Sequence, residues 1–370
     1  MDFGISEDQQ SIQALAREIL TDHVTHQRLS TLEAVGGSVF DRDLWGRLAE
    51  AGLTGLAVPA DHGGAGLGLV EVGLLLEELG RAVAPVPGVW TLASAMTVAR
   101  FAGTDLQGRL LPGVAAGSTL LTAALAEPGE TDPHAPTTTA VADGDGWRIS
   151  GEKAFVPYGE HADWLLVPAA RADGGTALFA VPREAEGVTV TPLLTTNREP
   201  HAQVELVDVP VDADALLGGE EAVTFAVQHA TVALCCLEAG VVDAALKMTA
   251  KYTGERKQFD KPIAEFQAVA QRAADAYVDA ELVRLTALQA AWRLSEGWPA
   301  ADEIAVAKFW AGDGGARVVH AAQHLHGGIG VDLDYPLHRY FLWSKQIEHS
   351  LGTPTRQLLT LGASLAAQPV

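Results

Sequence analysis

One stretch of this chain reads Glu255-Arg256-Lys257-Gln258-Phe259-Asp260-Lys261-Pro262-Ile263, and Phe266-Gln267 follow shortly after it. Arg256 offers a planar guanidinium with a permanent charge, which suits a pyrophosphate, and Phe259 offers a flat apolar surface. Taken alone, the stretch is better explained as a solvated helix end beside a proline-marked turn. Its surroundings therefore decide between the two interpretations.

Long helical segments lie on both sides of this stretch. After Gly218-Gly219, apolar residues recur with helical spacing. Short breaks divide this region into predicted helices at roughly 220–253, 263–296, 300–324 and 336–364. Four long helices with short connections predict a four-helix bundle over residues 218–370.

The chain before the bundle changes character twice. Ser6 and Gln9 form a predicted capping box, and further helices are expected near 42–52, 69–82, 88–102 and 105–113. Between about 119 and 217 the runs are short and β-like, with a hairpin turn predicted at Asp143-Gly144-Asp145-Gly146. These strand-like runs are Thr137–Val141, Trp147–Ile149, Trp164–Val167, Thr176–Val181 and Gly187–Thr191. The sequence thus predicts a mainly α protein with a central β domain: an N-terminal helical domain at 1–118, a small β-barrel at 119–217 and the bundle.

Composition excludes several partners. Acidic residues outnumber basic ones 47 to 25, for a formal net charge of −22, and such a field repels nucleic acid and anionic lipid. The first residues have no basic or apolar signal segment, and no uninterrupted apolar run approaches the ~18 residues of a membrane span. Cys235 and Cys236 lie in an apolar helical run, which predicts buried, reduced thiols. We expect a cytoplasmic protein.

Three motifs resemble those of the acyl-CoA dehydrogenase family. The stretch from Arg256 to Gln267 is similar to the family's R-x-Q-F-[GD]-x-P-I-x-x-F-Q motif. Leu325-His326-Gly327-Gly328-Ile329-Gly330, followed by Asp334-Tyr335-Pro336, resembles Q-x-x-G-G-x-G…[EDH]-[YH]-P. Ala126-Glu127-Pro128-Gly129, Gly151–Val156 and Ala162-Asp163-Trp164 resemble the pattern T-E-P-G…G-x-K-x-[WF]-I-T…A-D-W. The resemblance covers the whole chain in the domain order given above.

The resemblance implies an FAD-dependent oxidoreductase that acts on an acyl-CoA thioester. In this family a glutamate removes the α-proton, the β-hydrogen leaves as hydride to FAD, and an electron-transferring flavoprotein takes the electrons. The β-domain motifs bind the subunit's own flavin, whereas the bundle motifs reach a neighbour's flavin across a dimer interface. The cofactor-binding residues implied here are Arg256, Gln258, Phe259, Gln267, His324, Gly327, Gly328, Phe155, Thr131 and Thr353.

The chain departs from the family pattern at the catalytic base. Counting from Tyr335-Pro336 brings the glutamate position to Leu351, and the alternative position, 256 − 26 = 230, is Ala230. The motif for the subunit's own flavin is also changed: Ala126 and Pro157 replace threonines, and Glu130-Thr131-Asp132 replaces Gly-Ser-Asp. The motif given to a neighbour is intact from Arg256 to Phe259, although His324 replaces a usual glutamine.

This asymmetry predicts a non-catalytic subunit that completes a partner's FAD site. Actinobacterial α2β2 dehydrogenases of steroid side chains pair a catalytic chain with a chain that lacks the base, and Gly328–Phe341 resembles that group. The expected partner is therefore a homologous catalytic subunit, with a homo-oligomer as the alternative, and the expected substrate is a bulky acyl-CoA.

Two other hypotheses stay open. One is a self-sufficient dehydrogenase whose base is displaced to Glu348 or Glu238, although a solvated or salt-bridged helix carboxylate is the simpler interpretation of each. The other is a flavin oxidase or monooxygenase on the same fold. His320, His324 and His326 have no carboxylate or cysteine at ligand spacing, so no metal site is predicted.

Overall fold

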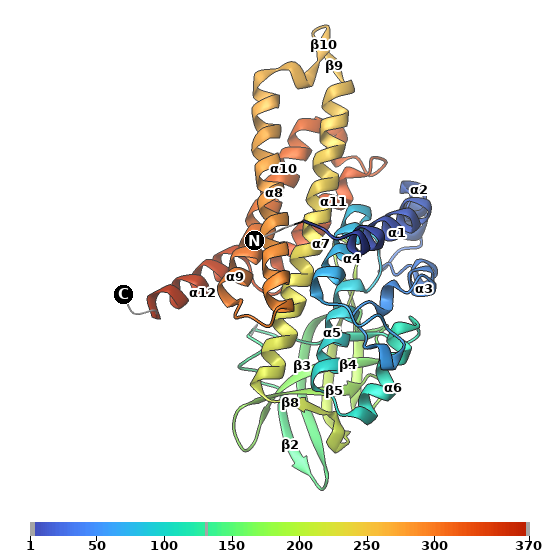
Figure 1. The fold of residues 1–370 in the computed structure, drawn as a ribbon, viewed down its shortest axis with the longest axis vertical. Helices are drawn as coiled ribbons and strands as arrows, with labels where there is room; N and C mark the ends of the chain where they lie inside the picture. The colour runs from blue at the N-terminus through green and yellow to red at the C-terminus, as the bar shows by residue number, and fades with distance from the viewer. Residues whose placement is uncertain (1–3, 130–131, 368–370) are drawn as a thin grey trace. The chain divides into compact units, whose positions relative to one another are not determined.

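A computed structural model describes residues 4–129 and 132–367, and Figure 1 shows the course of the chain. By its internal contacts the chain divides into two compact units. One contains Met1–His26, Gly73–Ala84 and Thr231–Val370, and the other contains Gln27–Val72 and Pro85–Ala230. The three domains predicted from the sequence follow chain order instead, and their boundaries stay predictions.

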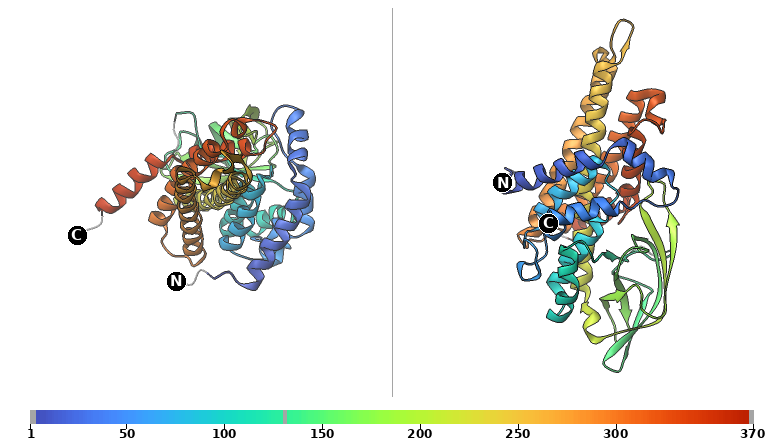
Figure 2. Two further views of the ribbon diagram at one scale, coloured as in Figure 1. Left: turned by 90° about the horizontal axis from the view of Figure 1, so that it is seen from above. Right: turned by 90° about the vertical axis from the view of Figure 1, so that its right-hand side faces the viewer.

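Helices and one short hairpin form the first unit. Its first helix, α1 (Glu7–His23), has the predicted capping box: Gln9 N donates to Ser6 Oγ at 3.2 Å, and Ser6 N donates to Gln9 Oε1 at 3.0 Å. The other elements that contribute to this unit are α4 (Leu69–Ala82), α7 (Glu220–Glu255), β9 (Lys257–Gln258), β10 (Lys261–Pro262), η4 (Ile263–Glu265), α8 (Gln267–Ser295), α9 (Ala301–Phe309), the π-helix η5 (Trp310–Gly314), α10 (Gly315–His326), η6 (Gly327–Val331), α11 (Leu337–His349) and α12 (Pro354–Ala367). Figure 2 shows α7 and α8 side by side, with the β9–β10 hairpin at their tip.

The fourth predicted bundle helix is wrong, because the chain turns between α11 and α12. Leu351 and Gly352 have left-handed φ angles of 52° and 96°. Pro354 then begins α12, as proline does at the first position of a helix, where its missing N–H is not needed. Glu348 and Leu351 therefore do not share a helix, since α11 ends at His349.

Helix α7 is the core helix of its bundle. Among the described residues it is the one helix whose length and mean hydropathy would suffice for a membrane span, but 83% of its most apolar window is buried within the protein. Its apolar residues therefore form a core. A Cβ at Gly240 would lie 1.9 Å from the carbonyl oxygen of Glu77, so glycine permits α4 to pack closely. Cys235 and Cys236 are buried as predicted, and burial raises the pKa of Cys235 to about 12.

The second unit combines helices with one sheet. Its helices are α2 (His26–Ala34), α3 (Arg42–Glu50), η1 (Leu53–Gly55), η2 (Ala60–His62), α5 (Gly88–Phe101), α6 (Thr104–Ala115) and η3 (Ala213–Ala215). Its strands are β1 (Leu121–Ala123), β2 (Thr139–Asp143), β3 (Gly146–Pro157), β4 (Trp164–Arg171), β5 (Thr176–Pro182), β6 (Val188–Leu194), β7 (Pro200–Val211) and β8 (Leu216–Gly218).

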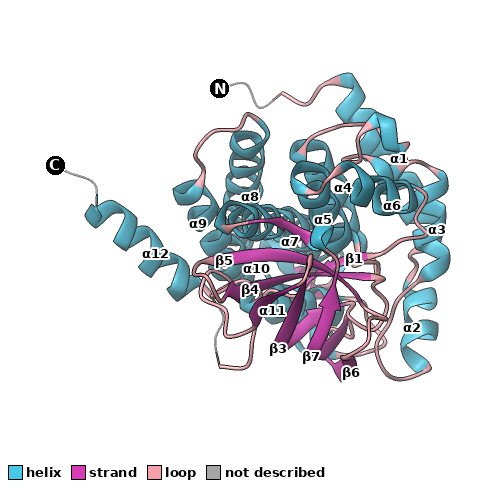
Figure 3. Ribbon diagram, turned by 90° about the horizontal axis from the view of Figure 1, so that it is seen from below, coloured by secondary structure: helices cyan, strands magenta, loops and turns pink. Residues whose placement is uncertain are grey.

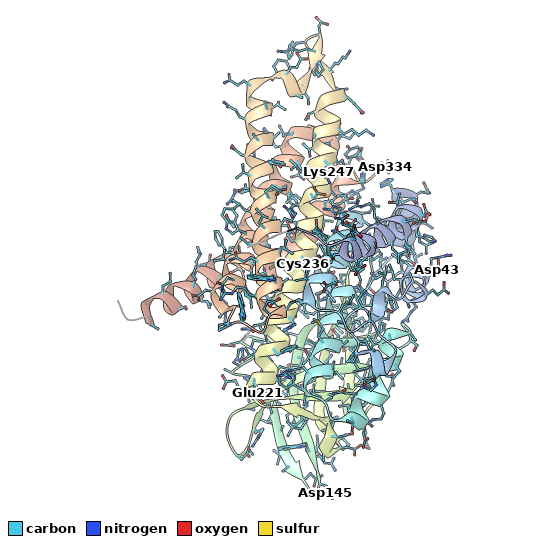
Figure 4. All side chains as sticks on the ribbon, viewed as in Figure 1. Asp43, Asp145, Glu221, Cys236, Lys247 and Asp334 are labelled. Carbon is cyan, nitrogen blue, oxygen red and sulfur yellow. The ribbon has the colours of Figure 1, made fainter. Side chains whose placement is uncertain are left out.

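The strands form an eight-stranded mixed sheet in the order β6-β7-β3-β2-β4-β5-β8, with β1 paired to β4 (Figure 3). Where the sequence predicted a small barrel, the structure therefore has one sheet that runs from β6 to β8. The predicted turn is confirmed, because Asp143 pairs with Gly146 and Gly144 has a φ of 60°. Figure 4 shows Asp145 at the tip of this hairpin. The mainly α architecture with a central β region is confirmed.

Candidate cofactor-binding site

A tight hairpin at the end of α7 carries the first motif. The last helical hydrogen bond runs from Arg256 N to Tyr252 O at 2.8 Å, and β9 then pairs with β10. Phe259 and Asp260, which connect the two strands, have φ angles of 52° and 66°. Two left-handed residues are what the tightest β-hairpins require. The turn leaves Phe259 88% exposed, so its ring is available to a ligand.

The second motif lies at the same end of the bundle. His326 at the end of α10 stacks on Tyr252 of α7, with ring centroids 4.5 Å apart, and its Nε2 lies 3.1 Å from the hydroxyl of Tyr335. Burial lowers the pKa of His326, so the ring is neutral at pH 7 and packs without a buried charge. The stack brings Gly327, the next residue, to the end of α7 that carries Arg256.

Three polar side chains at this end of the bundle are available to a ligand. Arg256, Gln267 and His324 are exposed, and their side chains have no hydrogen-bond or ion-pair partner among residues 4–129 and 132–367. A Cβ at Gly327 or Gly328 would meet nothing within 4 Å, so the backbone there is open to close approach. A free guanidinium and open glycine backbone at the same end of the bundle fit the phosphates of a dinucleotide.

In the second unit, two motif residues form a buried ion pair. Lys153 Nζ lies 2.6 Å from Glu127 Oε1, and the two side chains are 0% and 2% exposed. Lys153 also donates to Pro168 O at 2.7 Å, and Glu127 accepts hydrogen bonds from Thr137 and Thr138. Burial alone would raise the pKa of Glu127, but these hydrogen bonds outweigh it and lower the pKa to about 2. Burial lowers the pKa of Lys153 to about 8. The pair joins β3 to the segment between β1 and β2 and is closed to a ligand.

The rest of this motif fits a flavin only in part. Phe155 is 65% exposed and has a φ of 51° at a register shift between β3 and β7, where a bulge turns the ring outward. Pro157 has no N–H, and Ala126 has no hydroxyl, so two donors that the resemblance assigns to the flavin are missing. Thr131 lies outside the described residues.

Both positions expected for a catalytic carboxylate are aliphatic. Ala230 is buried in α7, and Leu351 lies in the turn before α12, next to the exposed Thr353. Glu348 forms an ion pair with a lysine one turn away on α11. The simpler interpretation of Glu238 is wrong, because its side chain is fully buried and its Oε1 accepts a hydrogen bond from a serine of α11.

A helical bundle with a free guanidinium and open glycine backbone at one end, in a chain with a mixed-sheet unit that exposes an aromatic ring, fits the dinucleotide cofactor of a flavin-dependent oxidoreductase. Family models match in the same order: the acyl-CoA dehydrogenase N-terminal domain at 6–118, the middle domain at 122–209 and the C-terminal domain at 218–366. The chain belongs to the acyl-CoA dehydrogenase family. The family is FAD-dependent, which confirms FAD as the expected cofactor.

Named relatives are similar over the full length. Acyl-CoA dehydrogenase FadE27 of Mycobacterium tuberculosis is 40% identical, with 100% of both chains covered. FadE28 of the same organism is 38% identical over 88% of this chain and 94% of its own. Among solved structures, the Tcur3481-Tcur3483 steroid ACAD G363A variant shares 46% identity, with a TM-score of 0.93 over 98% of this chain and 99% of that one. The ChsE4-ChsE5 complex from M. tuberculosis shares 39% identity, with a TM-score of 0.95 over 100% of both chains.

Proposed function

We propose that this chain is the non-catalytic subunit of a heteromeric acyl-CoA dehydrogenase and completes the FAD site of a homologous catalytic partner. One observation carries the proposal: at the bundle end that would serve a neighbour, Arg256, Gln267 and His324 have no partner among the described residues, whereas both base positions, Leu351 and Ala230, are aliphatic. An aliphatic side chain cannot accept the α-proton of a thioester. A subunit whose only role is to complete a partner's FAD site does not need its own catalytic base, but it does need Arg256.

The names of similar structures support the choice of partner and substrate. Both the Tcur3481-Tcur3483 protein and the ChsE4-ChsE5 complex combine two differently named chains, and the first is a steroid ACAD. We therefore propose a homologous, glutamate-bearing partner in an α2β2 assembly and a steroid side-chain CoA thioester as substrate. An electron-transferring flavoprotein is the proposed electron acceptor.

Each of the predicted cofactor-binding groups at this end has a proposed role toward the partner's cofactor. FAD, when bound, supplies the acceptor for the substrate hydride. Arg256 would neutralise its pyrophosphate, and the backbone at Gly327-Gly328 would approach it closely. Phe259 would cover an apolar part of the cofactor. Four polar side chains would donate or accept hydrogen bonds around it: Gln258, Gln267, His324 and Thr353.

A visible absorbance spectrum tests the proposal. The chain purified alone is expected to be colourless and to show no dehydrogenase turnover, because its own flavin motif lacks two donors. Co-purified with a glutamate-bearing homologue, it should give about one FAD per heterodimer, since only one kind of site is complete. A yellow homo-oligomer with one FAD per chain that is bleached by acyl-CoA would contradict the proposal. Glu348→Gln and Glu238→Gln would then identify the acting base.

A further inference from the structure

A polar cluster lies in the core of the bundle, outside the residues assigned to the cofactor. Glu238 of α7, Lys308 of α9 and Ser344 of α11 are each 0% exposed. Ser344 Oγ donates to Glu238 Oε1 at 2.7 Å, and Glu238 Oε2 has no partner within the described part of the chain. Lys308 Nζ donates to the carbonyl oxygens of Ile347 and Glu348 at 2.9 and 3.3 Å. Well-packed apolar residues commonly stabilise a core as well or better, so this cluster calls for another explanation.

The neighbouring helix is deformed where it meets Glu238. Trp310–Gly314 form a π-helix between α9 and α10, and such widened turns are frequent at functional sites. Gly315 follows directly, and a Cβ there would lie 2.3 Å from Glu238 Oε1. Any larger residue at this position would displace the carboxyl. The absence of a side chain at Gly315 thus leaves the space that Glu238 occupies.

The same segment also contacts both helices that flank the α11–α12 turn. A Cβ at Gly312, inside the π-helix, would lie 2.6 Å from Cγ of Pro354, the first residue of α12. Lys308, two residues before the π-helix, binds the last carbonyls of α11. The segment 308–315 therefore touches Glu238, the end of α11 and the start of α12.

The turn between these helices depends on such support. Leu351 has a φ of 52°, a left-handed conformation that is unfavourable for a residue with a Cβ and persists only where its surroundings impose it. Its carbonyl oxygen accepts a hydrogen bond from Gln357 Nε2 of α12 at 3.2 Å. A loosened α11 or α12 would release Leu351 from this conformation.

Glu238 carries a proton at neutral pH. Burial raises its pKa to about 8, although the hydrogen bond from Ser344 opposes this shift. The titratable groups that face it are Lys308 of α9, Lys345 and Glu348 of α11, and the thiol of Cys235 on α7. The two lysines lower the pKa of Glu238 and Glu348 raises it, so burial dominates.

We propose that Glu238 is a positioning residue: its neutral carboxyl, packed on Gly315 directly after the π-helix and bonded to Ser344, holds the α11–α12 turn that carries Leu351 and Thr353, and loss of its proton favours opening of that turn. The relevance of the turn to a cofactor rests on the proposed function, but the way in which the turn is held does not. The folded pKa lies above the ordinary value of 4.5. The stabilisation is therefore complete below pH 4.5 and is lost progressively as pH rises toward 8.

Hydrogen exchange of the purified chain, without FAD, tests this role. After correction for intrinsic rates, the opening equilibrium constant of the backbone amides at 350–353 and 355–357 should increase roughly tenfold per pH unit between about pH 5 and 8, relative to that of the amides of α5. Glu238→Gln keeps the size of the side chain and the bond to Ser344, and should abolish this slope. Glu220→Gln, an exposed carboxylate on the same helix, should retain it.

Two results would overturn the inference: no slope in the unmodified chain, or the same slope in Glu238→Gln. Ser344→Ala keeps the carboxyl but removes its partner, so it should raise opening at low pH; unchanged opening there would also count against the role. If Glu238→Gln does not fold, the slope of the unmodified chain still decides. Because FAD is absent throughout, failure here leaves the proposed function untouched, and a colourless partner subunit could still show the slope.

Discussion

Arg256→Ala is expected to lower the affinity of the heteromer for FAD by about tenfold to a hundredfold. A hydrogen bond to a charged group contributes roughly 1.5–3 kcal/mol, and 1.4 kcal/mol corresponds to a factor of ten. The Arg256 side chain is exposed and without a partner among residues 4–129 and 132–367, so its removal breaks nothing within the chain that is described. Titration of FAD into the flavin-free heteromer, followed by flavin fluorescence, measures the change.

Two further variants separate a specific contact from general charge. Lys251→Ala removes an exposed positive charge from the same helix and should leave FAD affinity within about twofold, because exposed charges contribute little at distance. Arg256→Lys keeps the charge but loses the planar fork, and should give an intermediate affinity. The unfolding temperature should be the same in all three variants. Unchanged FAD affinity in Arg256→Ala would contradict the role given to this residue.

Local sequence signals predicted the bundle end well. The break before Pro262 marked the end of α7, and the glycines after His326 marked the end of α10. Both signals act over a few residues, through the missing N–H of proline and the backbone freedom of glycine. What the sequence could not show is that Tyr252 and His326 stack, because that contact depends on how two distant helices pack.

The errors have physical causes of the same kind. Residues 336–364 have helical spacing throughout, and a leucine gives no sign that Leu351 will adopt a left-handed conformation. Strand β7 was missed although Ala202, Val204 and Leu206 alternate toward the core. Glu238 was expected to be solvated or salt-bridged because carboxylates usually are, but it is buried against Gly315, which lies more than 70 residues further along the chain (315 − 238 = 77). Tertiary packing decided each case.

Lys153→Met is expected to destabilise the sheet unit by roughly 3–5 kcal/mol, the usual result of removing one partner from a buried ion pair. Glu127 would stay buried with its charge and lose its closest partner, Lys153 Nζ at 2.6 Å. Urea unfolding followed by tryptophan fluorescence measures the loss. Arg148→Met breaks the exposed pair with Asp143 in the same sheet and should cost far less. A Lys153→Met protein as stable as the unmodified one would refute the importance of the pair.

The double variant Glu127→Gln/Lys153→Met should recover much of that stability, because it leaves no unpaired charge in the core. The pH dependence gives an independent check. Since the folded pKa of Glu127, about 2, lies below its ordinary 4.5, the unmodified chain gains stability from this carboxylate above pH 4.5 and loses it as pH falls toward 2. The double variant has no such group at 127, so its stability should fall less over that range. An equal acid loss in both proteins would mean that other carboxylates, and not Glu127, control the acid stability of the sheet.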